Sequence, residues 1–91
     1  MSNSEKIRAY LEDLNPEALL MDGFDDALIG IASQFSNGPI ALYDRSKCIE
    51  VLMRDGATWE EAEEYFSFNC EGAWLGKTTP IIAELTENLG E

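Results

Sequence analysis

Three aspartates stand within five residues of the sequence, directly before an apolar run: Asp22, Asp25 and Asp26 precede Ala27–Phe35. Carboxylate oxygens in such a cluster could hold a hard cation such as Mg²⁺ or Ca²⁺. The spacing does not fit an EF-hand loop, which needs acids at alternating positions and a downstream glutamate. The pair Asp22-Gly23 is typical of a turn. These residues therefore predict a turn before a strand, with a metal site as the alternative.

A fourth aspartate, Asp44, extends the metal alternative. It follows the expected strand Ile40–Tyr43, and a hairpin would bring it back toward Asp25 and Asp26. Carboxylates gathered at one end of a sheet could hold Mg²⁺ for phosphoester or nucleotide chemistry. Asp44 is equally well explained as the N-cap of a following helix. The alternative thus has four ligands, Asp22, Asp25, Asp26 and Asp44, whereas our leading hypothesis has no cofactor.

Two other patterns resemble reactive sites only superficially. The stretch Gly72–Thr78 ends in Gly-Lys-Thr but is one residue shorter than a phosphate-binding loop, and Pro80 follows where a helix should begin. The two cysteines, Cys48 and Cys70, form no CxxC pair, and the chain contains no histidine. A zinc site or an activated cysteine nucleophile is therefore not expected. We interpret both cysteines as reduced packing residues.

The acidic segment Trp59–Phe66 is the feature that we favour for function. Its glutamates would attract a basic protein, and its tryptophan could anchor that partner if it is exposed. The alternative is an ordinary solvated helix with an apolar stripe. Together with the aspartate cluster, the predicted partner face comprises Asp22, Asp25, Asp26, Trp59, Glu60, Glu61, Glu63 and Glu64.

The overall charge supports a partner of this kind. The 91 residues carry a formal net charge of −12, and residues 9–44 and 55–76 contain no lysine or arginine. Such a chain repels nucleic acid and anionic membranes and attracts basic proteins, although acidic residues can also serve solubility alone. No apolar run approaches membrane-spanning length, and the N-terminus lacks a secretory pattern, so we expect a cytoplasmic location. Self-association into a homo-oligomer stays open.

The first half of the chain predicts two helices and a hairpin. Ser4 could cap a helix whose apolar face is Ile7, Tyr10, Leu11 and Leu14. A second, short helix is expected from Pro16, with Asn15 as its cap. The run Ala27–Phe35 reads as a strand, and Asn37-Gly38 is typical of the tight turn before a return strand at Ile40–Tyr43.

The second half predicts a helix pair and a last strand. One helix follows Asp44, presents Cys48, Ile49, Leu52 and Met53 as its apolar face, and ends at Gly56. Thr58 and Glu61 form a capping box for the next helix, whose apolar face is Ala62, Tyr65, Phe66 and Asn69. We expect these helices to pack antiparallel. Trp74 and Leu75 should anchor the loop before a third strand at Ile81–Leu85.

These elements predict one α+β domain over residues 1–91, with residues 1–3 and 86–91 frayed. We expect an antiparallel β-hairpin or three-stranded sheet packed against the antiparallel helix pair and the N-terminal helix.

The motif string itself resembles a family. The segments DGFDDALIGI and LYDRSKCIEVLMRDGATWEEAEEYFSFNCEGAWLGKTTP are similar to small acidic proteins of tailed bacteriophages and of bacteria, over roughly residues 20–82. The resemblance implies a phage-type accessory protein in the cytoplasm of a bacterial host. The family carries no agreed activity, so the resemblance supplies no catalytic residues.

These observations lead to one main hypothesis and three alternatives. The main hypothesis is a non-enzymatic protein that binds a host or phage protein through its acidic face. The alternatives are a metal-dependent phosphoester or nucleotide enzyme, a DNA-mimic inhibitor and a component of virion assembly.

Overall fold

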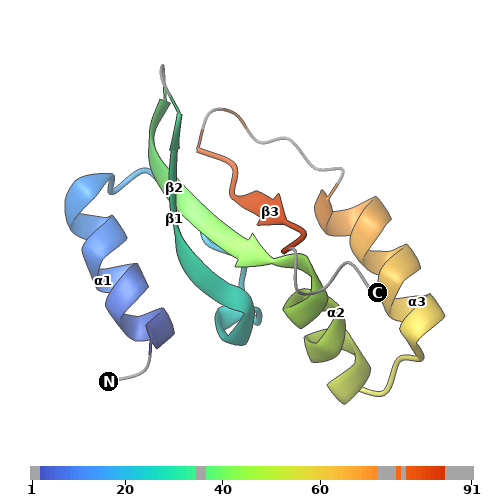
Figure 1. Cartoon of the computed structure of the whole chain (residues 1–91). Helices are drawn as coiled ribbons and strands as arrows, with labels where there is room; N and C mark the ends of the chain where they lie inside the picture. Colours follow the sequence, from blue (N-terminus) through green and yellow to red (C-terminus); the bar gives the residue numbers. More distant parts are fainter. Residues whose placement is uncertain (1–2, 35–36, 72–75, 77, 86–91) are drawn as a thin grey trace.

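A computed structural model describes residues 3–34, 37–71, 76 and 78–85. Its helices and strands follow one another along the chain as shown in Figure 1. They are α1 (Asn3–Leu14), the 3₁₀-helix η1 (Asp25–Ala27), β1 (Leu28–Gln34), β2 (Asn37–Asp44), α2 (Arg45–Arg54), α3 (Trp59–Phe66), the π-helical turn η2 (Ser67–Glu71) and β3 (Ile81–Ala83). The predicted α+β architecture, a three-stranded sheet with an N-terminal helix and a helix pair, is confirmed.

The sheet is mixed rather than antiparallel. Its strand order is β1-β2-β3, with β1 antiparallel to β2 and β3 parallel to β2. The third strand was predicted as part of an antiparallel sheet, and that direction is wrong because β3 runs parallel to β2. After β2 the chain runs through α2 and α3 before it returns to the sheet, and a helical crossover of this kind allows β3 to run parallel to β2.

The hairpin differs in detail from the sequence prediction. Gln34 pairs with Asn37, so only residues 35 and 36 separate the two strands, and these lie outside the described part of the chain. The Asn37-Gly38 pair therefore belongs to β2, and its predicted role as the turn is wrong. The pairing between opposed strands outweighed the local turn preference of Asn-Gly, because strand register also depends on which residues are buried.

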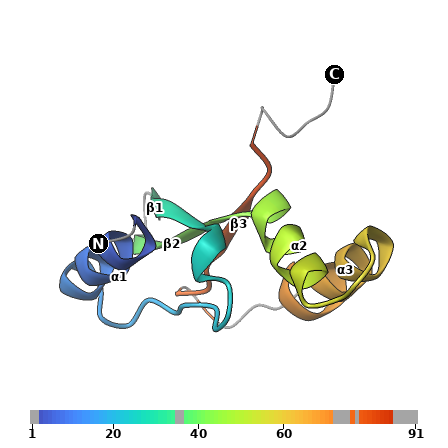
Figure 2. The ribbon, with the colours of Figure 1, turned by 90° about the horizontal axis from the view of Figure 1, so that it is seen from below.

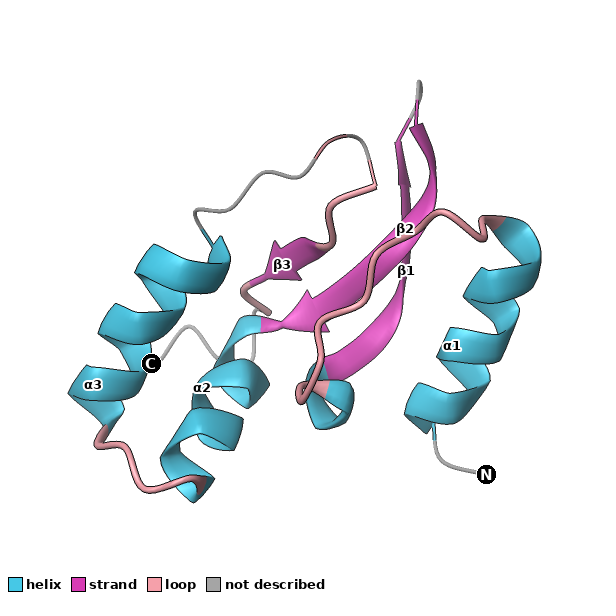
Figure 3. Ribbon diagram, turned by 180° about the vertical axis from the view of Figure 1, so that it is seen from behind, coloured by secondary structure: helices cyan, strands magenta, loops and turns pink. Residues whose placement is uncertain are grey.

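The predicted second helix after Pro16 does not form. Residues 15–24 contain turns and irregular backbone, and several of their hydrogen bonds go to distant parts of the chain. Asn15 donates from its side-chain amide to the carbonyl oxygen of Pro39 at 2.8 Å, and the Leu19 amide donates to the carbonyl oxygen of Thr78 at 3.2 Å. Figure 3 shows this segment crossing the sheet between α1 and the helix pair.

The core lies between one face of the sheet and the elements that cover it. Strand pairing sets Leu28 opposite Tyr43 and Ile31 opposite Ala41, and these four side chains face the core. Leu11 from α1 and Phe66 from α3 join the same cluster, so the buried surface runs from one end of the molecule to the other. Figure 2 shows the chain between α1 and η1 passing beneath the sheet, where it closes this core.

The helix pair follows its sequence signals closely. The side chain of Asp44 caps α2 by accepting from the Ser46 amide, and Thr58 and Glu61 form the predicted capping box of α3. Gly56 has a φ of 112° just after α2, a backbone conformation that favours glycine. Cys48 and Ile49 are buried as predicted, whereas Met53 is 40% exposed.

Candidate functional site

The aspartate cluster lies in the approach to β1. Asp22 and Gly23 form a turn, with Gly23 at a φ of 87°, so the turn interpretation is confirmed for this pair. Asp25 and Asp26 belong to the 3₁₀-helix η1 that follows. The apolar neighbours Phe24 and Ala27 hold η1 in place, since both pack in the core cluster and Phe24 meets Phe66 edge-on with ring centroids 6.0 Å apart.

Both aspartates of η1 are bound by arginines from other elements. Arg8 on α1 donates to Asp25 at 2.7 Å, and Arg54 on α2 donates to Asp26 at 2.9 Å. The sequence could not indicate these pairs, because both arginines lie outside the base-free segment that contains the cluster. The aspartates therefore present less uncompensated negative charge than the sequence pattern suggests.

The fourth member of the metal alternative, Asp44, is buried and caps α2. Its carboxylate oxygen Oδ1 accepts from the Ser46 amide at 3.0 Å. Nowhere in the described ranges do three or more histidine, cysteine, aspartate or glutamate side chains form a group that could share a metal ion. The structure thus does not bring Asp22, Asp25, Asp26 and Asp44 together, and the metal-dependent enzyme stays a prediction.

The acidic helix α3 is anchored by a narrow buried stripe. Ala62 and Phe66 are fully buried, four residues apart. Tyr65 was predicted to share this apolar face, but it is 53% exposed, and Asn69 is exposed as well. The prediction was wrong because α3 packs mainly against α2 and so buries only the side chains that point directly at that helix (Figure 1).

The glutamates of α3 differ in their surroundings. Glu61 accepts from the Thr58 amide at 2.9 Å in the capping box, and Glu63 lies 3.9 Å from Arg45. Glu60 and Glu64 are exposed, and within the described chain neither has a hydrogen bond or an ion pair. These two carboxylates are therefore available to a partner without breaking an internal contact.

Large aromatic side chains are exposed on and just after α3. Trp59 is 56% exposed, as the predicted partner face requires, and Tyr65 and Phe68 are 53% and 80% exposed. Sequence reasoning missed the last two because an aromatic residue at helical spacing is normally part of the core. Ala62 and Phe66 are enough to form the buried side of this short helix. The presence of two further aromatic residues, Tyr65 and Phe68, was therefore a signal in the sequence that some rings would be exposed.

The remaining sequence motifs contribute little to a site. Cys48 is a buried thiol that forms no disulfide, whereas Trp74, Leu75 and Lys77 of the glycine-rich loop lie outside the described residues. The described part of that loop contains Gly76, at a φ of 101°, and Thr78, which accepts the bond from Leu19.

The described helices are all too short or too polar to cross a membrane. Comparisons of the chain with protein-family models, with curated proteins and with solved structures found no match. The resemblance to phage proteins therefore stays a prediction from the motif string.

Proposed function

We propose that this protein is a non-enzymatic binding module that docks a basic protein partner on the outer side of α3. The contact surface is the acidic–aromatic stripe, which we define as Glu61, Glu64, Tyr65 and Phe68. The observation that carries the proposal is the exposure of Tyr65 and Phe68 beside carboxylates on a folded, well-capped helix.

The spacing of these four residues supports a single surface. Positions separated by three, four and seven residues lie along one side of a helix, and here that exposed side lies next to the buried stripe of Ala62 and Phe66. Phe68 stands in η2, which continues α3 directly. Trp59 and Glu63 of the predicted face lie on the other flank of the helix, so they would border the contact rather than form its centre.

The chemistry of the stripe fits a basic, partly apolar partner. Exposed aromatic side chains provide most of the binding energy in many interfaces, because burying a large ring releases much ordered water. Glu60 and Glu64 add negative charge without internal partners in the described chain. Charges at the rim of an interface mainly raise the association rate and make binding sensitive to salt.

The aspartates contribute to this proposal in a different way. Asp25 and Asp26 are already paired with arginines, so they add to the long-range field more than to direct contact. The setting in a phage-infected bacterial cytoplasm is part of the proposal and is supported by the motif resemblance. The net charge of −12 favours a basic protein over nucleic acid as the partner.

The test uses two matched variants of the full chain. Tyr65→Ser/Phe68→Ser removes the aromatic part of the stripe, and Tyr10→Ser removes a tyrosine that is equally exposed, at 65%, but lies on α1. Each protein is immobilised and exposed to infected-cell extract at low salt, and the captured proteins are identified. The proposal expects one basic partner that the wild type and Tyr10→Ser retain and the stripe variant loses.

A second variant separates the effect of the carboxylates on the association rate from the contribution of the aromatic contacts. Glu60→Gln/Glu64→Gln should slow association with the captured partner and flatten its salt dependence, with little change in dissociation rate. Light scattering of the purified protein shows whether a second copy covers the stripe. The proposal fails if all variants capture the same proteins equally, or if the stripe is buried in a stable homo-oligomer.

A further inference from the structure

The outer edge of the sheet, at β1, has no pairing strand within the described part of the chain. The strand order β1-β2-β3 places β1 at one edge, and β1 pairs with β2 alone. An edge strand presents a row of backbone N–H and C=O groups with which an incoming strand can pair. Figure 2 shows α1, β1, β2 and β3 following one another across the molecule, so α1 stands beside this edge.

Edge strands are usually protected against pairing with another chain, and β1 has few of the usual protections. Charged side chains and prolines on an edge strand discourage such pairing. β1 contains neither, and residues 27–43 carry no charged side chain although the net charge of the whole chain is −12. Register shifts occur near its two ends, before Gly30 and after Ala32, so the middle of the strand is regular.

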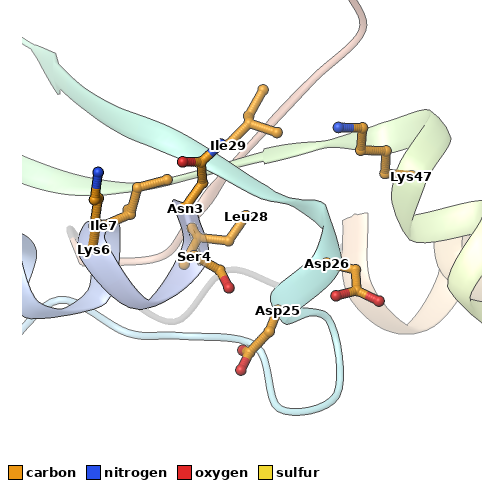
Figure 4. Close-up of a pocket in the computed structure, with 9 residues that line it drawn as sticks. All are labelled: Asn3, Ser4, Lys6, Ile7, Asp25, Asp26, Leu28, Ile29 and Lys47. Carbon is orange, nitrogen blue, oxygen red and sulfur yellow. The ribbon is translucent and has the colours of Figure 1, made fainter. Parts of the chain in front are cut away.

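A hollow follows this edge along the seam between α1 and β1. One part, of about 570 Å³, is lined on the strand by residues 28–29, and a second part, of about 300 Å³, by residues 30–31. Both parts are also lined by Lys6 and Ile7 of α1, and Figure 4 shows these two side chains in the first part, with the start of β1 beside them. The hollow thus accompanies four consecutive strand residues, or about 13 Å of extended chain.

The lining of the hollow favours apolar side chains and one carboxylate on a ligand. Lys6 lines both parts and makes no ion pair within the described chain. The second part is otherwise apolar apart from the Tyr10 hydroxyl, since Ile7 and Ile31 face it as well. A carboxylate beside Lys6 would therefore gain a favourable contact without breaking one inside the protein.

We propose that β1 and α1 bind an extended peptide segment of another protein, which joins the sheet as a fourth strand beside β1. Its backbone pairs with the edge of β1, its apolar side chains lie against Tyr10 and Ile31, and one carboxylate lies near Lys6. Main-chain bonds give affinity in this mode of recognition, and pockets for alternate side chains give specificity. A second copy of this chain fits less well, because α1 lies where the rest of a second sheet would have to continue.

This site goes beyond the proposed docking on α3 and does not depend on it. Figure 1 shows α1 and α3 at opposite ends of the molecule, with the sheet between them. A ligand strand beside β1 therefore leaves the acidic–aromatic stripe open.

The experiment titrates the isotope-labelled full chain with a capped heptapeptide that alternates valine and threonine around a central glutamate. We expect saturable shifts of the amide signals of β1 and of the α1 residues that line the hollow. Hydrogen exchange of β1 amides should become slower in the complex, because amides at the edge gain a partner. The same peptide with methylated backbone nitrogens cannot donate hydrogen bonds and should not bind.

Variants separate the charge contact from the ring contact. Lys6→Gln, or glutamine in place of the glutamate of the peptide, should weaken binding about threefold, as for an exposed ion pair. The two changes together should weaken it no further, because they remove the same contact. Tyr10→Ser should also weaken binding. The matched control is Tyr65→Ser/Phe68→Ser, which removes exposed rings from α3 and should leave the peptide affinity unchanged.

Three results with the peptide would overturn the proposal: no saturable shift at β1, equal binding of the methylated peptide, or an equal loss of affinity in the α3 variant and Tyr10→Ser. It is also overturned if light scattering shows a dimer whose β1 amides are already protected from exchange, because a second copy then covers the edge. Capture of a partner by α3 does not enter these measurements, so the two proposals can fail separately.

Discussion

The backbone amide of Met21 donates a hydrogen bond of 2.8 Å to the hydroxyl oxygen of Tyr43. Tyr43 is fully buried on β2, and Met21 belongs to the irregular segment that crosses the sheet. Because this segment has no helix to satisfy its amides, a side chain from the core does so instead. The bond therefore fixes the segment to the sheet in front of the aspartate cluster.

Removing the Tyr43 hydroxyl should destabilise the fold. Tyr43→Phe keeps the ring but leaves the Met21 amide without its partner, and we expect a loss of about 1–2 kcal/mol in the free energy of unfolding. Urea denaturation measures this change. Tyr10→Phe, at an exposed site on α1, is the control and should stay within about 0.5 kcal/mol of the wild type. Equal effects of the two substitutions would contradict the assigned role of the bond.

The same tyrosine should make stability fall at high pH. Burial raises the pKa of the Tyr43 phenol, the Met21 amide partly lowers it, and the nearby charge of Asp25 raises it further. The native state thus keeps the phenolic proton to a higher pH than the unfolded chain does. The resulting stabilisation is complete below about pH 10 and is lost as the pH rises through the raised pKa.

Melting curves between about pH 9 and 11 would reveal this contribution. The wild type should lose stability more steeply over this range than Tyr43→Phe, because the variant has no phenol at this position. Ionisation of the other groups affects both proteins and cancels in the comparison. Parallel pH profiles would show that Tyr43 does not titrate differently in the folded and unfolded states.

Elements with strong local signals could be predicted from the sequence. The cap at Asp44, the capping box of Thr58 and Glu61 and the stop at Gly56 each depend on residues close together in the chain, and all three form. Asn15 shows where this reasoning ends. Its side chain could cap a helix, but its amide instead donates a hydrogen bond to the carbonyl oxygen of Pro39 in β2, which is far away in the sequence. Local preference is weaker than a part-buried hydrogen bond of this kind.

For a similar reason, only part of the candidate site could be predicted from the sequence. Exposure of Trp59 follows from its position at the start of a capped helix, whereas the pairing of Asp25 with Arg8 depends on how α1 lies against η1. Exposure of Tyr65 likewise depends on how α3 sits against α2. Ion pairs and exposed stripes that arise between distant segments need the tertiary arrangement, which a single sequence does not reveal.

Arg45 should contribute more to stability than Arg54. It donates to the Ser67 hydroxyl oxygen at 3.3 Å and lies 3.9 Å from Glu63 and Glu84, and its guanidinium carbon is 5.9 Å from the centre of the Phe66 ring. Its side chain is only 18% exposed, compared with 60% for Arg54. It therefore joins α2, α3 and the segment after β3.

We expect Arg45→Met to cost about 1–2 kcal/mol of unfolding free energy, since a half-buried network and a cation–π contact are lost. Arg54→Met, which breaks only a surface pair with Asp26, should cost less than about 0.5 kcal/mol. Urea midpoints of both variants provide the comparison. A larger effect at Arg54 would mean that the surface pair, rather than the Arg45 network, holds the helices to the rest of the fold.

Gly56 provides a test of backbone strain that is free of packing effects. Its φ is 112°, its amide donates to the Met53 carbonyl oxygen at 3.0 Å, and an added Cβ atom would meet no atom within 4 Å. Gly56→Ala should therefore cost about 1–2 kcal/mol through conformation alone. At Gly30, where φ is ordinary and the added Cβ would lie 3.7 Å from the Leu42 side chain, alanine should be neutral or stabilising. Thermal melting measures both effects. If both substitutions were neutral, the turn after α2 could adopt a φ that alanine tolerates. The short connection would then not by itself fix the antiparallel packing of α2 and α3.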